Sequence, residues 1–164
     1  NICLNVILDH SRHLLNRLHD NSIDVCFSYL ATNEISYKCI PYKTDEIIFV
    51  TNSQNIQFSN GIHNGEILHL PIIYSKFMPK SGFDWIHDIF PPHYVFQFTI
   101  SVIKEIIPFL LQYPYYAFLP RKLIEKELKD GLLIEIPLLD YHIPPLQSYI
   151  IMKSNAKYNP LDYF

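Results

Sequence analysis

Short segments of alternating or continuous apolar residues, separated by polar breaks, make up the first part of the chain. Residues 2–8 alternate apolar and polar side chains, which predicts a strand. Residues 12–20 place Leu14, Leu15 and Leu18 on one face, which predicts a helix that ends at Asn21 in a left-handed conformation. Residues 23–29 predict a second strand. Strand, helix and strand within about 30 residues indicate a βαβ unit with parallel pairing, and so an α/β fold.

The remaining pattern continues the alternation of strands and helices. Pro91 and Pro92 are expected to stop one helix, Pro108 to kink or shorten another, and Gly131 to cap a third. Strands are predicted at 35–41, 46–51, 70–74, 94–99, 115–119, 132–137 and 146–152, and helices at 82–90, 101–113 and 121–129.

Composition narrows the possible functions. The formal charge is −3, with 13 basic and 16 acidic residues, and the sequence has no dense run of Lys or Arg, so this segment by itself is not expected to bind DNA. No apolar run reaches the roughly 18 residues of a membrane span. Hydrophobic residues make up 49% of the chain, which favours an apolar face that meets a partner.

Two stretches resemble the effector-binding domain of LysR-type bacterial transcription regulators. In the first, Leu18 and Asn21 lead into the buried strand Ile23-Asp24-Val25, and Ile40-Pro41-Tyr42 leads through Asp45-Glu46 into Ile48-Phe49-Val50. The second is Tyr116-Ala117-Phe118-Leu119-Pro120 followed by Glu127-Leu128-Lys129-Asp130-Gly131-Leu132-Leu133. The chain departs from the family at Asn21, which replaces a glycine, and at Tyr113-Pro114-Tyr115, which replaces Gly-x-Gly and leaves the pocket shape near Tyr115 in question.

The resemblance implies a type 2 periplasmic-binding-protein fold, with two Rossmann-like lobes and mostly parallel sheets. Residues 1–43 and 144–164 are expected to form lobe I, which lacks its N-terminal part, and residues 44–143 to form lobe II. The family's first strand and helix and its winged helix-turn-helix would precede Asn1, and a C-terminal helix would follow Phe164.

By the same resemblance, the chain is a cytoplasmic ligand-sensing and dimerisation domain and not an enzyme. A small, anionic metabolite that carries a carboxylate would bind in the cleft between the lobes and modulate transcription. DNA binding would belong to the absent N-terminal domain, and the homodimer would use the apolar helix at 101–113. No cofactor and no membrane partner are implied.

Polar residues gather where predicted strands end, which is where open α/β sheets bind their ligands. Ser11 and Thr99 also precede helices, so each can present a hydroxyl and free N–H groups to an anion, although simple helix capping is an equal reading of Ser11. Aromatic walls would suit an effector with an apolar part. The candidate ligand-binding residues are His10, Ser11, Ser28, Tyr29, Tyr74, Ser75, Lys76, Phe98 and Thr99.

Metal and catalytic sites are poorly supported. His10 and His13, with His19 nearby, have the spacing to share a helix face, but no second pair of ligands accompanies them. No nucleophile motif or phosphate-binding glycine loop is present. The competing functions are a secreted solute-binding protein of the same fold and, less favoured, an α/β enzyme. The identity of the effector and the direction of regulation stay open.

Overall fold

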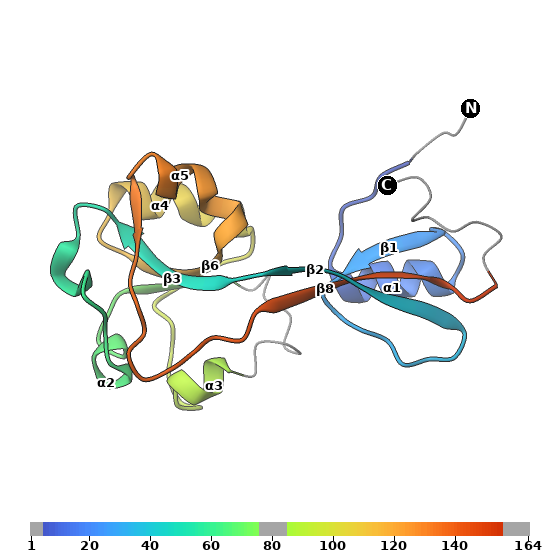
Figure 1. Cartoon of the computed structure of the whole chain (residues 1–164), viewed down its shortest axis with the longest axis horizontal. Coiled ribbons are helices and arrows are strands. Elements are labelled where there is room, and N and C mark those ends of the chain that lie inside the picture. Colours follow the sequence, from blue (N-terminus) through green and yellow to red (C-terminus); the bar gives the residue numbers. More distant parts are fainter. Residues whose placement is uncertain (1–4, 76–84, 156–164) are drawn as a thin grey trace. The chain divides into compact units, whose positions relative to one another are not determined.

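The computed structural model describes residues 5–75 and 85–155. The chain forms two compact units, each with its own sheet (Figure 1). Unit 1 is Asn1–Lys43 together with Gln147–Phe164, and unit 2 is the continuous stretch Thr44–Leu146. The chain therefore passes between the units twice.

Unit 1 packs one helix against a three-stranded sheet of order β1-β8-β2. Leu18 of the helix, Cys26 of β1 and Ile151 of β8 are almost fully buried and form its core. Cys26 lies opposite Ile151 in an antiparallel pair. The elements are α1 (Ser11–His19), β1 (Val25–Ser28), β2 (Tyr37–Asp45) and β8 (Leu146–Lys153).

The end of α1 confirms the predicted left-handed residue. Asn21 has a φ of 64°, and the N–H groups of Ser22 and Ile23 both donate to the carbonyl of Arg17. Asparagine tolerates this backbone conformation better than most residues with a side chain. The chain thus reverses direction without glycine and enters β1.

The predicted βαβ unit is wrong in two respects. Residues 5–8 form no strand, and Val6 and Leu8 are 79% and 94% exposed, so their apolar alternation buries no face. The rest of the predicted strand lies outside the described residues. The strand β1 pairs antiparallel with β8, which comes from the far end of the sequence. Local periodicity carries no information about such a distant partner.

Unit 2 contains a five-stranded mixed sheet of order β5-β4-β6-β3-β7. The strand β4 pairs in parallel with β5 and β6, whereas β3 pairs antiparallel with β6 and β7. The α/β class is confirmed, but the sheets are mixed rather than mostly parallel. The strands are β3 (Ile47–Asn52), β4 (Ile72–Ser75), β5 (Phe98–Ile100), β6 (Tyr116–Pro120) and β7 (Leu133–Glu135).

Helices cover both faces of this sheet, with α4 and α5 on one side of β3 and β6 and α2 and α3 on the other (Figure 1). The core under α4 is formed by Ile48, Val50, Ile106, Leu110 and Leu119, all of them at most 5% exposed. The helical segments are η1 (Ile56–Phe58), α2 (Asn64–Ile67), α3 (Ile86–Ile89), η2 (Ile103–Glu105), α4 (Ile106–Gln112), η3 (Arg121–Ile124) and α5 (Glu125–Lys129).

Two elements begin later in the structure than the sequence predicted, each for a physical reason. Pro108 is expected to kink or shorten the helix predicted at 101–113, and α4 is indeed shorter. It starts at Ile106, so Pro108 lies in its first turn, where a missing N–H costs nothing. The strand predicted at 94–99 begins only at Phe98. Upstream of it, the rings of Tyr94 and Phe96 pack against Phe90 at 4.7 and 5.0 Å instead of entering the sheet.

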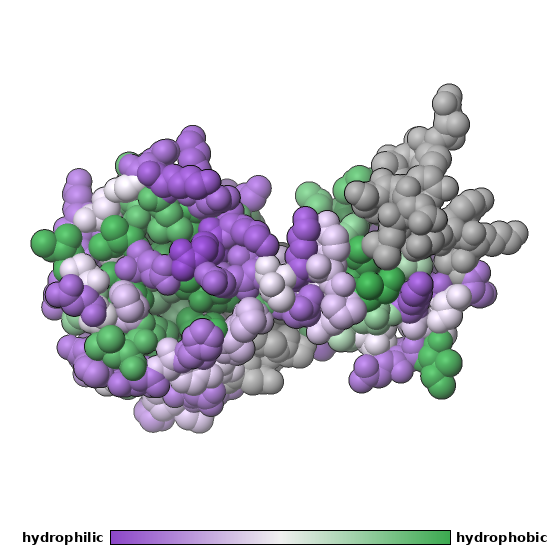
Figure 2. Space-filling view, viewed as in Figure 1, coloured by the Kyte–Doolittle hydropathy of each residue, from purple (hydrophilic) through white to green (hydrophobic). Residues whose placement is uncertain are grey.

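The surface of unit 2 mixes polar and apolar residues on the face that Figure 2 shows, with apolar side chains in separate groups. Within residues 5–75 and 85–155, no helix has the length and apolar character needed to cross a bilayer.

Candidate ligand-binding site

The predicted site residues of unit 1 gather where α1 begins and β1 ends. The backbone N–H of Tyr29 donates to the hydroxyl oxygen of Ser11 at 3.2 Å, which fixes these two segments together. Ser28 is buried, and its hydroxyl exchanges hydrogen bonds with the N–H and carbonyl of Leu30, both at 2.9 Å. Ser28 therefore stabilises the turn after β1. Ser11 and Tyr29 join the start of α1 to the end of β1 and stay candidate ligand-binding residues.

Charged side chains surround the first turn of α1. The Asp9 carboxylate accepts hydrogen bonds from the His10 N–H at 2.8 Å and pairs with the His13 ring at 2.9 Å, and Arg17 lies 3.5 Å away. The bond to His13, then that from His10, lowers the pKa of Asp9. His10 is the N-cap residue, although its side chain makes no capping hydrogen bond. The first N–H groups of any helix lack helical acceptors and attract anions.

The predicted residues of unit 2 lie on two paired parallel strands, but Phe98 begins β5 and Thr99 is its middle residue, so neither is at the carboxyl end as predicted. Tyr74 of β4 is the register partner of Thr99 in β5, and Ile73 is that of Phe98. Phe98 is 42% exposed, and its ring lies 4.8 Å from that of Tyr115. Ser75 is buried. Lys76 lies outside the described residues.

The structure thus brings Ser11 and Tyr29 together in unit 1, and Tyr74 and Thr99 together in unit 2. Each pair belongs to its own unit. The contribution of both pairs to a single ligand site stays a prediction.

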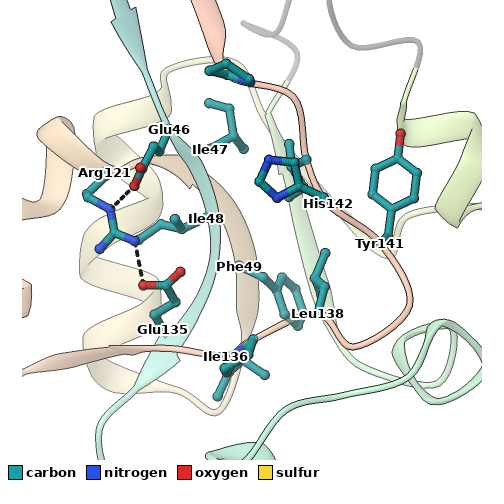
Figure 3. A pocket seen from close by; sticks show the side chains of 13 residues that line it. Glu46, Ile47, Ile48, Phe49, Arg121, Glu135, Ile136, Leu138, Tyr141 and His142 are labelled. Carbon is teal, nitrogen blue, oxygen red and sulfur yellow. Dashed lines mark hydrogen bonds and ion pairs between the residues drawn. The ribbon is translucent and has the colours of Figure 1, made fainter.

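A cavity of about 410 Å³ that no sequence pattern indicated lies within unit 2 (Figure 3). On one side of β3, Arg121 bridges Glu46 and Glu135, with its Nε 2.5 Å from one carboxylate and its terminal nitrogen 2.7 Å from the other. These bonds, first that to Glu135, raise the pKa of Arg121. Ile47, Phe49, Leu138 and His142 lie on the other side.

The cavity exists because the segment that follows β7 turns away from its neighbour β3. Pro137 has no N–H to continue the ladder with β3, and the segment that follows it pairs with Ile62 instead. The Ile62 N–H donates to the Pro137 carbonyl at 2.9 Å, and the Leu139 N–H donates to the Ile62 carbonyl at 3.0 Å. Gly61, with a φ of 114°, permits this approach, because a Cβ there would lie 2.6 Å from the Leu139 side chain.

Further bonds hold the outer wall of the cavity. Tyr141 donates its hydroxyl to Asp88 at 2.6 Å, and this bond raises the pKa of Tyr141 to about 12. Asp140 accepts the Asn64 N–H at 2.9 Å and pairs with the His63 ring, also at 2.9 Å. The backbone bond from Asn64, then His63, lowers the pKa of Asp140, and Asp140 raises the pKa of His63.

The His63 and Asp140 pair is expected to make stability depend on pH. The contribution of His63 is complete below its unfolded pKa and is lost as the pH rises through its higher folded pKa. The contribution of Asp140 is present above its unfolded pKa and is lost as the pH falls through its lower folded value. The melting temperature of wild type should therefore exceed that of His63→Gln most at mildly acidic pH, and the gap should close at alkaline pH.

Thermal melts across this pH range, with the exposed His69→Gln as the matched control, measure the effect. A constant difference between wild type and His63→Gln at every pH would show that the pair does not contribute through charge.

Sequence reasoning missed the residues of the cavity. In the sequence, Glu46 begins a predicted strand and Arg121 begins a predicted helix, and nothing indicates a contact between them. Glu46, Arg121 and Glu135 come together only because β3 lies between β6 and β7, and that order has no local signature. Pro137, at the end of an apolar strand, is a signal from which an irregular sheet edge could have been inferred.

Comparisons with known proteins place the fold. No family model and no curated protein matches the sequence. Among solved structures, OxyR of Corynebacterium glutamicum (C206 mutant) is 19% identical, with 91% of this chain and 48% of that one covered, at a TM-score of 0.67. The regulatory domain of HypT from Salmonella typhimurium is 16% identical, with 94% and 75% covered, at a TM-score of 0.70.

The effector-binding domain of a BenM variant is 14% identical, with 94% of this chain and 73% of that one covered, at a TM-score of 0.65. The chain spans about half the length of the OxyR structure. The fold is accordingly that of regulatory domains of bacterial transcription factors. It is, more specifically, the periplasmic-binding-protein-like fold of LysR-type effector-binding domains, as the sequence resemblance indicated.

Proposed function

We propose that the chain is the ligand-sensing domain of a cytoplasmic LysR-type transcription regulator, without enzymatic activity. The observation that carries this proposal is the structural likeness to effector-binding and regulatory domains, which extends over at least nine tenths of the chain. Control of DNA binding would act through a winged helix-turn-helix outside the present sequence.

The proposed effector is a small metabolite with a carboxylate. The start of α1, with Ser11 held against the Tyr29 backbone, supports an anion-binding position. Tyr74 on β4 and Phe98 and Thr99 on β5 support recognition of its apolar part. The proposed lobes are residues 1–43 with 144–164 and residues 44–143. A ligand with different affinities for two conformations would shift the population between them, which is the proposed signal.

Calorimetry of the protein against small organic acids and the standard amino acids tests this function. At least one acid is expected to bind, and Ser11→Ala is expected to weaken it about tenfold or more, because hydrogen bonds to charged groups contribute roughly 1.5–3 kcal/mol. The control is Ser36→Ala, an exposed serine of the same unit. If no acid binds, or if both variants lose affinity equally, the proposed site is wrong.

We also propose that the chain self-associates through η2 and α4. Val102, Phe109 and Tyr113 are 56%, 41% and 50% exposed. Phe109 lies in α4, Tyr113 directly follows α4 with its ring 6.5 Å from that of Phe109, and Val102 directly precedes η2. Exposed apolar residues that lie close to one another are typical of protein interfaces, and the molar mass in solution is the direct test.

A further inference from the structure

The backbone of β3 leaves hydrogen-bonding groups at the cavity of unit 2. In an antiparallel ladder, successive residues direct their N–H and C=O groups to opposite neighbours. The Arg121 N–H donates to the Glu46 carbonyl at 2.8 Å, so Glu46 faces β6. Ile47 and Phe49 must then face the β7 side. There, the Phe49 carbonyl accepts the Ile136 N–H at 2.8 Å.

Beyond that bond the ladder stops. The register between β3 and β7 ends at the pair Val50 and Glu135, because the following segment pairs with Ile62 instead. Within the described part of the chain, no backbone partner meets the N–H of Phe49 or the N–H and C=O of Ile47. Both residues are at least 95% buried and line the cavity. Buried backbone groups of this kind normally have partners.

The spacing of these groups defines what can pair with them. The Ile47 carbonyl and the Phe49 N–H flank one intervening residue on a strand edge. In a parallel pairing, one residue of the neighbouring strand satisfies both groups: its N–H donates to the carbonyl and its C=O accepts the N–H. The matching ligand therefore carries a donor nitrogen and an acceptor carbonyl on either side of one carbon atom.

Charge decides between ligands of this shape. Two carboxylates, Glu46 and Glu135, face one guanidinium, Arg121, which leaves one net negative charge beside the cavity. Arg121 already bonds to both carboxylates, so it offers little to an anion. A positively charged nitrogen is favoured here and a ligand carboxylate is disfavoured. A residue that bonds to these two groups pairs with Ile48, so its side chain lies on the same face of the sheet as Ile48, which lines the cavity and supplies apolar surface (Figure 3).

We propose that this cavity binds an α-amino amide with an apolar side chain, the chemical unit of a peptide's amino terminus. The ammonium group donates to the Ile47 carbonyl and faces Glu46 and Glu135. The amide carbonyl accepts the Phe49 N–H. The volume of about 410 Å³ falls within the range of roughly 300–1,000 Å³ of small-molecule sites. The cavity is separate from the residues of the proposed effector site, so it is a second ligand position.

Titration with leucinamide, followed through the backbone amide signals of the ¹⁵N-labelled protein, tests this proposal. The signals of Ile47 and Phe49 are expected to shift and to saturate. Leucine, which replaces the amide by a carboxylate, and N-acetyl-leucinamide, which lacks the charged nitrogen, are both expected to bind more weakly. No saturable shift with leucinamide, or equal binding of leucine, would overturn the proposal.

A pair of variants isolates the charge. Glu135→Gln is expected to weaken leucinamide binding about two- to fivefold, the range of partly exposed ion pairs. Glu105→Gln, an exposed carboxylate on η2, should leave it unchanged. Equal affinity of wild type and Glu135→Gln would contradict the role of the carboxylates. The outcome for organic acids at Ser11 is independent of these results, so failure of either site is recognised separately.

Discussion

Replacement of Ile106 by alanine is expected to lower the free energy of unfolding of unit 2 by about 2–5 kcal/mol. Ile106 begins α4 and is fully buried against β3 and β6, where it packs with Ile48, Leu110 and Leu119. Loss of three carbon atoms removes their transfer energy and leaves a cavity that the rigid sheet cannot fill. Because Ile106 anchors α4 to the sheet, its truncation is also expected to loosen the helix that carries the proposed interface.

Chemical denaturation measures this effect, and Ile56→Ala is its matched control. Ile56 is 69% exposed on η1, so the same truncation there should change the unfolding free energy by less than about 0.5 kcal/mol. Because the chain has two units, the transition of unit 2 should be followed by Trp85 fluorescence, since Trp85 is buried in that unit. Similar losses in both variants would contradict the burial of Ile106.

The second large effect is expected at the surface. Wild type should be a dimer by light scattering, and Phe109→Glu should weaken it by about 2 kcal/mol or more, roughly thirtyfold in Kd, as at the centre of other interfaces. Phe109 is 41% exposed, and its ring is 6.5 Å from that of Tyr113. A carboxylate there would be desolvated against an apolar partner.

Val95→Glu serves as the control, because Val95 is 80% exposed but lies outside η2 and α4. It should remain a dimer. A monomeric wild type at high concentration, or a Phe109→Glu protein that stays dimeric, would remove this face as the interface.

Segments with a local physical signature were predictable from the sequence. Asn21 takes the left-handed conformation expected of it, and Gly131, with a φ of 67°, does the same after α5. The apolar run before Pro120 forms β6, and residues 146–153 form β8. At the two helix ends the decisive interactions lie within a few residues. The two strands are apolar enough to be buried whichever strands they pair with.

What the sequence could not supply depends on contacts between distant residues. Cys26 opposite Ile151 and Ile62 opposite Leu138 join segments more than 70 positions apart. The candidate site divides in the same way. The paired strand residues Tyr74 and Thr99 followed from strand prediction, whereas Glu46, Arg121 and Glu135 required the sheet order. Lys76 lies outside the described residues.

The central position of β8 in the sheet of unit 1 has a consequence for synthesis of the protein. Its neighbours β1 and β2 leave the ribosome about a hundred residues before it does, whereas every strand of unit 2 belongs to the stretch made in between. Domains generally fold as units during translation. We therefore expect unit 2 to fold first. The strands β1 and β2 would stay unpaired, and open to chaperones, until β8 is translated and completes their sheet.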